Sequence, residues 1–278
     1  MELTFLVDNN SLVGKPFLSE PALSMHLADG DTKILFDAGY SEIFLTNARR
    51  MGLSMLELTH VVLSHGHYDH TWGLDALLRH YYEAGELKLD VPRPAMVAHP
   101  QVFASKFDDK SPEFGSLLSE NKVSRHFEMA LSSEPQWLSE KIVTLGEIER
   151  VFDFEASKPM GNRMAAGGVV KDELPDDTAI AYVGDEGLVV ITGCAHSGVC
   201  NTVEQARRVT GVENVLSVVG GFHLRNAKPE RLDPTTDYLA ALNLESLYAC
   251  HCTDLAAKIG LARKCPVREV GSGLKISF

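Results

Sequence analysis

A short stretch of the chain, residues 65–70, contains four side chains of the types that bind metal ions: His65, His67, Asp69 and His70. In an extended backbone, residues i and i+2 project to the same side, so His65 and His67 can bind one ion. Asp69 and His70 begin the next predicted helix and face a second position. Imidazole and carboxylate groups suit Zn²⁺, Mn²⁺ or Fe²⁺. The stretch therefore predicts a site for one or two divalent ions, with zinc as the first choice.

The segments around this stretch predict the elements that position it. Residues 59–64 form an apolar run suited to a buried strand, and 72–84 have apolar residues on one helical face. Upstream, the apolar runs 22–28 and 33–37 flank an Asp-Gly-Asp turn, which is typical of a hairpin. A polar helix is predicted over 41–51. The metal-binding stretch thus follows a hairpin, a helix and a buried strand.

The same order recurs in the second half of the chain. The runs 178–183 and 188–192 flank a second turn, a helix is predicted over 200–210, and a strand over 214–219. We interpret the chain as a duplicated hairpin–helix–strand unit. Two such halves, each a sheet covered by helices on one side, predict an α/β fold, a four-layer αββα sandwich with the site between the sheets at the strand ends. Residues 1–278 would then form a single domain.

Residues 103–165 differ in composition from the two halves. They are rich in Ser, Glu and Pro, and the one strong strand signal lies over 137–148. We interpret this segment as an insertion that packs over the sandwich. Because it leaves and re-enters near the junction of the halves, we expect it to border the substrate cleft.

Composition excludes several classes of protein. The 278 residues are 45% hydrophobic and 23% charged, which is typical of a globular protein. The net charge of −12 argues against a nucleic-acid partner, because binding to phosphates needs clustered Lys and Arg. No run approaches the roughly 18 apolar residues of a membrane span, and the N-terminus lacks the basic start of a signal peptide. Five cysteines favour reduced thiols and a cytoplasmic location over a disulfide framework.

The motif at 65–70 resembles the His-x-His-x-Asp-His signature of the metallo-β-lactamase superfamily, and the turn at 36–39 resembles its upstream Asp-x-Gly. Three later stretches, 192–198, 220–224 and 250–253, are similar to a subgroup of metal-dependent hydrolase-like proteins. Members of that subgroup are often named 7,8-dihydropterin-6-ylmethyl-4-(β-D-ribofuranosyl)aminobenzene 5′-phosphate synthase. The resemblance covers nearly the whole chain and implies the αββα fold.

The resemblance also implies a set of metal ligands, with one departure. Most members have an Asp that bridges two metals where this chain has Cys194, and residues 169–180 lack the usual isolated His. His196 is the available substitute, and His251 matches the last His ligand of the superfamily. One metal is expected at His65, His67 and His196, and the other at Asp69, His70 and His251.

Cys194, His223 and Asp37 have several roles open to them. Cys194 either binds metal as a thiolate or only packs in the core. Without a bridging carboxylate, we expect the second metal to be held more weakly than the first. His223 follows two glycines and would orient substrate, donate a proton or bind metal. Asp37 would accept the second N–H of a metal-bound histidine.

Two functions follow from such a site. Two metals can hold a hydroxide at neutral pH, so hydrolysis of an ester, lactone or phosphoester of a small molecule is the simplest chemistry, with Asp69 and His223 as catalytic residues. The alternative is a transferase that joins a dihydropterin-methyl diphosphate to a ribofuranosylaminobenzene phosphate. Five basic residues are candidate contacts for a phosphorylated substrate: Lys158, Arg163, Arg225, Lys228 and Arg231. The sequence contains no signal that indicates an oligomeric state.

Overall fold

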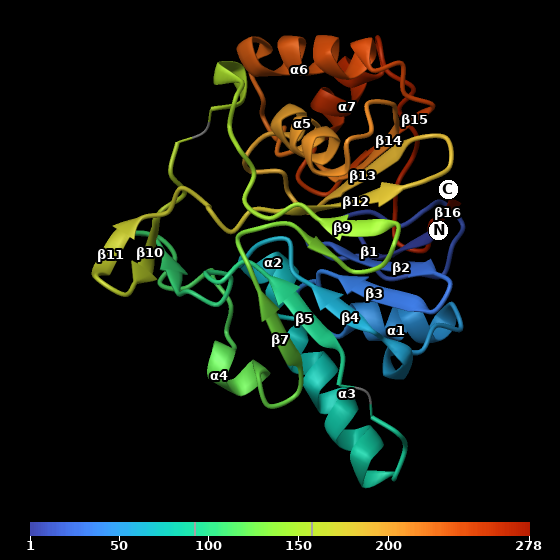
Figure 1. Cartoon of the computed structure of the whole chain (residues 1–278), viewed down its shortest axis with the longest axis vertical. Helices are drawn as coiled ribbons and strands as arrows, with labels where there is room; N and C mark the ends of the chain where they lie inside the picture. Colours follow the sequence, from blue (N-terminus) through green and yellow to red (C-terminus); the bar gives the residue numbers. More distant parts are fainter. Residues whose placement is uncertain (92, 157) are drawn as a thin grey trace. The chain divides into compact units, whose positions relative to one another are not determined.

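The computed structural model describes residues 1–91, 93–156 and 158–278 (Figure 1). The chain divides into two compact units. The first unit contains residues 1–132, 159–176 and 271–278, and the second contains residues 133–158 and 177–270.

The first unit is built on a sheet in the order β16-β1-β2-β3-β4-β5-β7. Its strands are β1 (Glu2–Val7), β2 (Ser24–Asp29), β3 (Thr32–Phe36), β4 (His60–Val62), β5 (Ala95–Ala98), β7 (Glu128–Leu131) and β16 (Lys275–Ser277). The hairpin predicted around the Asp-Gly-Asp turn is confirmed, since β2 and β3 pair antiparallel with Asp29 opposite Thr32. From β3 onward the neighbouring strands are parallel.

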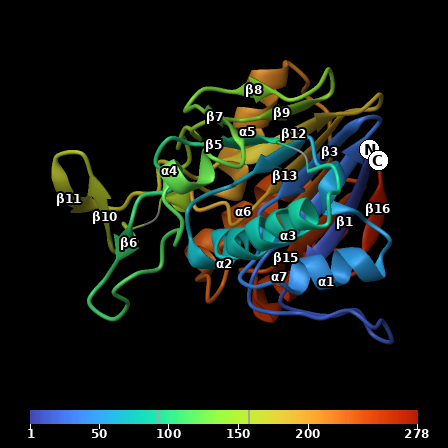
Figure 2. The ribbon, with the colours of Figure 1, turned by 90° about the horizontal axis from the view of Figure 1, so that it is seen from below.

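The helices of the first unit cover one face of this sheet (Figures 1 and 2). They are α1 (Ile43–Arg50), α2 (Tyr68–Thr71), α3 (Leu74–Glu86), α4 (Glu120–Val123) and a 3₁₀ turn at Met55–Glu57. In α3 the apolar residues Leu74, Leu77 and Tyr81 recur at helical spacing and pack with Val61 and Leu63 in one core. The helices predicted over 41–51 and 72–84 are confirmed, with α3 ending at Glu86.

The second unit is built on a sheet in the order β15-β14-β13-β12-β9-β8. Its strands are β8 (Gln136–Trp137), β9 (Ile142–Thr144), β12 (Ala179–Val183), β13 (Leu188–Thr192), β14 (Val215–Gly221) and β15 (Ser246–Cys250). Its helices are α5 (Val199–Thr210), α6 (Pro229–Ala241), α7 (Leu255–Leu261) and a 3₁₀ turn at Asp153–Glu155. Figure 1 shows α5, α6 and α7 on the same face of this sheet.

The recurring order predicted for the two halves is confirmed within each unit. In both units an antiparallel hairpin is followed by a helix and then by two parallel strands: β2-β3-α1-β4-β5 and β12-β13-α5-β14-β15. Parallel strands present their carboxyl ends at one edge, where loops carry functional residues. Each unit therefore offers the same set of strand ends to its loops.

The segment 103–165 contains more strands than its sequence indicated. The expectation of one strand over 137–148 is wrong, because β8 and β9 are two short strands that pair as a hairpin. Strand β7 extends the first sheet, whereas β8 and β9 extend the second. A separate sheet of three strands, β6 (Lys106–Phe107), β10 (Asn162–Ala165) and β11 (Gly168–Lys171), projects from the first unit (Figure 2). Among the described residues, no helix has the length and apolar character needed to cross a bilayer.

Candidate metal centre

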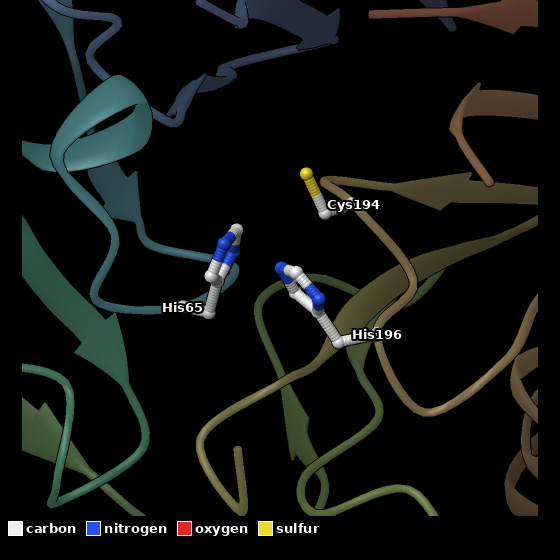
Figure 3. A group of neighbouring side chains, drawn as sticks. All are labelled: His65, Cys194 and His196. Atoms are coloured by element: carbon white, nitrogen blue, oxygen red, sulfur yellow. The ribbon is translucent and has the colours of Figure 1, made fainter. Parts of the chain in front are cut away.

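Three histidines of the predicted motif lie together in the first unit, directly after β4. His65 Nε2 is 3.0 Å from His67 Nδ1, and the ring centroids of His65 and His70 are 4.2 Å apart. His65 and His70 are fully buried, and His67 is 5% exposed. Figure 3 shows His65 on the loop that follows the strand. The motif therefore forms a compact cluster of imidazoles, as its spacing predicted.

Asp37 holds two parts of this cluster through one carboxylate. Its Oδ1 accepts a hydrogen bond from the Ser64 backbone N–H at 2.7 Å, and its Oδ2 accepts one from Ser64 Oγ at 2.7 Å. Oδ2 also lies 2.6 Å from His70 Nδ1. With Nδ1–H donating to the carboxylate, Nε2 of His70 is the nitrogen left for a metal. Asp37 therefore contacts a histidine of the motif as predicted, and the histidine is His70; that His70 binds metal stays a prediction.

A buried ion network fixes the turn between His65 and His67. The Gly66 N–H donates to Asp176 Oδ2 at 2.8 Å, and a side chain at Gly66 would come within 2.2 Å of the Val102 carbonyl oxygen. Lys106 Nζ lies 2.8 Å from Asp176 and 2.9 Å from Asp172, and all three side chains are fully buried. Burial alone would raise the pKa of Asp176, but the Lys106 ammonium lowers it. Sequence reasoning missed this network because its members are distant in sequence and match no motif.

Charge and burial keep His67 in the form that binds metal. Burial, followed by the charge of Lys106, lowers the pKa of His67 to about 3. The imidazole is therefore neutral at physiological pH, as a metal ligand must be.

Asp69 lies in the short helix α2 and is the most exposed of the four metal-binding residue types in the motif. Its side chain is 17% exposed, and its Oδ1 is 3.8 Å from His70 Nε2. A carboxylate that reaches solvent beside a ligand nitrogen is placed to bind metal or to accept a proton.

The second unit carries its own group of donors, in the loops after β13, β14 and β15. The thiol of Cys194 lies within 4.8 Å of donor atoms of both His196 and His251. The side chains of Cys194 and His196 extend from the same loop (Figure 3). The ring centroids of His196 and His223 are 4.3 Å apart. Cys194, His196 and His251 are buried, whereas His223 is partly exposed. The late motifs of the sequence thus converge within this unit.

These loops turn sharply at residues other than glycine. Ala195, His223 and His251 have φ values of 52°, 48° and 52°, in the left-handed region. Such conformations cost on the order of 1–3 kcal/mol each and cluster at functional sites. Two of the three strained positions carry the side chains that sequence analysis selected.

Buried carboxylates support the loop that holds Cys194 and His196. Asp177 Oδ2 accepts a hydrogen bond from the Ser197 N–H at 2.8 Å. Glu155 accepts from the N–H groups of Cys200 and Asn201 at 2.9 and 2.8 Å, at the first turn of α5. Burial raises the pKa of Glu155. Sequence analysis missed Glu155, because it lies in the segment interpreted as an insertion.

Cys252 is a second thiol beside Cys194 that sequence analysis did not select. The His223 N–H donates to its Sγ at 3.2 Å, and its S–H lies 3.5 Å from the Cys194 carbonyl oxygen. Burial alone would raise the pKa of this thiol, but hydrogen bonds with Cys194 and His223 hold it well below its usual value. The thiolate is the form that binds metal and acts as a nucleophile.

The proposed anion contacts have different surroundings. Lys158, Arg225 and Lys228 are exposed. Arg163 lies 3.5 Å from Asp172 in the first unit, so its charge is already paired. Arg231 lies on α6 of the second unit and is partly buried.

With these clusters described, comparison with known proteins decides the family. Residues 20–209 match the sequence model of the metallo-beta-lactamase superfamily. The chain belongs to this superfamily. The match spans the hairpin β2–β3, the motif at 65–70 and the loop with Cys194 and His196.

Individual relatives are similar to this superfamily member in sequence and in structure. A Methanocaldococcus jannaschii protein named 7,8-dihydropterin-6-methyl-4-(beta-D-ribofuranosyl)-aminobenzene-5'-phosphate synthase is 32% identical over 91% of this chain and 87% of its own length. A crystal structure of Tm1679, described as a metal-dependent hydrolase of the beta-lactamase superfamily, has a TM-score of 0.82 with 27% identity, covering 100% of this chain and 99% of that one. The Bacillus subtilis metallo-beta-lactamase fold protein YhfI, 13% identical with a TM-score of 0.57 over 99% of both chains, shares the fold. The predicted α/β sandwich of the metallo-β-lactamase type is confirmed.

Proposed function

We propose that the protein is a metal-dependent hydrolase that acts on an ester, lactone or phosphoester of a small molecule. The observation that carries this proposal is the buried cluster of His65, His67 and His70 with Asp37 bonded to its far side. Buried imidazoles, one of which has a ring nitrogen held by a carboxylate, are a donor set that divalent zinc, manganese and iron take.

The proposed ligands are those that the sequence motifs predict. His65 and His67 would bind one ion with His196, and Asp69 and His70 would bind the other with His251. The residues fit this role within their own units, because each histidine is buried and the pKa of His67 is lowered. When bound, the ions would supply a hydroxide at neutral pH and polarise the reacting oxygen of the substrate.

The chain's own residues carry the remaining roles. Asp69, partly open to solvent, would accept the proton that the attacking water loses. Asp37 would keep His70 in one tautomer and one orientation. His223, the least buried histidine of the second cluster, would orient the substrate, donate a proton to the leaving group or bind metal.

A second candidate function is favoured by the name of the 32% identical relative. In this alternative the chain is a transferase that joins a dihydropterin-methyl diphosphate to a ribofuranosylaminobenzene phosphate. Exposed basic residues such as Arg225 and Lys228 would then contact phosphate groups, and the site would have to exclude water.

Product analysis with metal-loaded protein tests both functions. We would assay phosphodiesters, lactones, thioesters and pterin diphosphates, the last with and without the aminobenzene acceptor. A hydrolase releases product without acceptor, whereas a transferase forms the joined product and needs the acceptor. Replacing Asp69 with Asn should lower kcat by roughly 10²–10⁴-fold, while Asp75→Asn, an exposed aspartate on α3 paired with Arg79, should not. Equal loss in both variants, or no turnover of any substrate class, would refute the proposal.

A further inference from the structure

Two thiols and one imidazole meet within the second unit, and none of the three is among the six ligands of the proposed hydrolytic site, although Cys194 also lies within 4.8 Å of donor atoms of His196 and His251. The donor atoms of Cys194, His223 and Cys252 all lie within 4.8 Å of one another. They come from the loops that follow β13, β14 and β15, three adjacent strands of one sheet. The placement of this cluster therefore depends on one unit alone.

The backbone around the cluster leaves space for it. A side chain at Gly221 would come within 2.6 Å of Cys252 Sγ, so the absence of a side chain there lets the thiol approach β14. His223 occupies a left-handed conformation with φ of 48°, which directs the chain sharply after the strand. Its Nδ1 is buried and has no hydrogen-bond partner among the described residues. A buried imidazole nitrogen without a partner is costly unless something binds it.

We propose that Cys194, His223 and Cys252 form a thiolate-rich metal site that prefers Zn²⁺. Zn–S bonds of about 2.3 Å and Zn–N bonds of about 2.0 Å would place the donors at spacings of roughly 3.5 Å, which lies within the 4.8 Å that encloses them. Two thiolates would balance the charge of the ion. This site assigns His223 as a ligand and gives Cys194 a function other than replacing a bridging aspartate.

The three protein donors leave a fourth position on a tetrahedral ion. Sites with three protein ligands typically keep this position for water or substrate, whereas structural zinc sites have four. His196, whose ring centroid lies 4.3 Å from that of His223, stands beside the cluster. A small molecule with an anionic oxygen or a thiolate is the class of ligand that such a position takes.

Cobalt substitution in the full-length chain tests the site. Co²⁺ bound by thiolates gives an intense charge-transfer band in the near ultraviolet, and the intensity follows the number of Co–S bonds. The intensity per bound Co²⁺ should fall by about half in Cys252→Ser or Cys194→Ser, since one of two thiolates is lost. Cys265→Ser, a buried cysteine of the same unit, is the matched control and should keep the full band. A band unchanged by Cys252→Ser, or its absence at every Co²⁺ concentration, would overturn the proposal.

Two further measurements separate this site from the hydrolytic one and from a folding defect. The thiolate band should persist in the His65→Ala, His67→Ala double variant, even where metal-dependent activity is lost; its disappearance there would show that the cluster is not an independent site. In the unaltered chain, Zn²⁺ in excess over all the proposed metal positions should slow alkylation of Cys252 by about tenfold or more, measured by peptide mass spectrometry. An alkylation rate that ignores Zn²⁺ would also overturn the proposal.

Discussion

The two units share one order of strands and helices but carry different metal-binding side chains in the loops that follow the strands. After β4 the first unit carries imidazoles, with carboxylates and a lysine bonded behind them. After β13, β14 and β15 the second unit carries thiols mixed with imidazoles, on turns with positive φ. The shared strand order provides positions at the strand ends, whereas the loop sequences decide which metals those positions favour.

Both units support their loops with buried carboxylates that accept backbone N–H hydrogen bonds. Asp37 and Asp176 do so in the first unit, and Asp177 and Glu155 in the second. The first unit adds a buried cation, because Lys106 lies 2.8 Å from Asp176. Removing that cation should therefore destabilise the support of the first cluster.

The largest expected effect comes from removing a ligand of the first cluster. We expect His67→Ala to abolish metal-dependent activity and to lower metal affinity at this cluster by more than roughly 100-fold, because losing a ligand costs more than losing its hydrogen-bond partner. Elemental analysis after dialysis and circular dichroism would check occupancy and fold. His126→Ala, an exposed histidine, is the control. Full metal occupancy in His67→Ala would show that the first cluster does not bind metal through His67, and the contrast between the two units would lose its basis.

The next effect concerns the buried ion network. Lys106→Met leaves Asp176 buried without its cation and leaves Asp172 with Arg163 alone, so we expect the free energy of unfolding to fall by about 3–5 kcal/mol. Urea unfolding measures this change. Lys141→Met in the second unit is the matched control, because the Lys141–Asp185 pair is exposed and should contribute less than about 1 kcal/mol. Equal losses of unfolding free energy in the two variants would show that burial does not make the Lys106 ion pairs more important than the exposed Lys141–Asp185 pair.

A smaller effect is expected from the carboxylate behind the cluster. Asp37→Asn keeps the shape of the side chain but removes the charge that faces His70, so metal affinity should fall by about 10–100-fold. Titration of metal-free protein with Zn²⁺ would measure it, with Asp185→Asn as an exposed control. An unaltered Zn²⁺ affinity would mean that Asp37 stabilises the turn at Ser64 and does not contribute to metal binding.

The smallest effect is a pH dependence of protein stability that arises from a histidine in the first sheet. Burial, followed by the charge of Lys33, lowers the pKa of His26 on β2 to about 4. The corresponding hairpin strand of the second unit, β12, carries no histidine. The unfolded chain binds this proton with a pKa of about 6.5, so unfolding is favoured as pH falls from 6.5 toward 4. We expect metal-free protein to lose about 2 kcal/mol from this residue between pH 7 and 5.

Urea unfolding at the two pH values, in the presence of a chelator, measures that loss. His26→Leu should reduce the difference between them, and the exposed variant His126→Leu should not. An unchanged pH difference in His26→Leu would assign the titration to other groups, such as His67.

Much of this architecture could be predicted from local sequence. Both hairpins, helices α1, α3 and α5, and the cluster at 65–70 follow from short-range patterns of apolar residues, turns and ligand spacing. Lys106 and Asp176 could not be found, because 70 residues separate them and only the folded chain brings them together. Glu155 was missed and Cys252 was not selected for a related reason: their roles depend on which strand ends are adjacent. Short strands such as β7 and β8 carry too few residues for an alternating pattern to be recognised.

The pairing of β1 with β16 has a consequence for synthesis of the chain. Glu2 lies opposite Ser277, and the Met1 amino group donates to the Phe278 carbonyl oxygen at 2.7 Å. Until residues 275–277 leave the ribosome, one side of β1 has unpaired N–H and C=O groups, which is the edge that promotes aggregation. Strand β1 is therefore synthesised before the whole of the second unit, and its partner β16 is synthesised after it. A nascent chain must protect that open edge until β16 has been made.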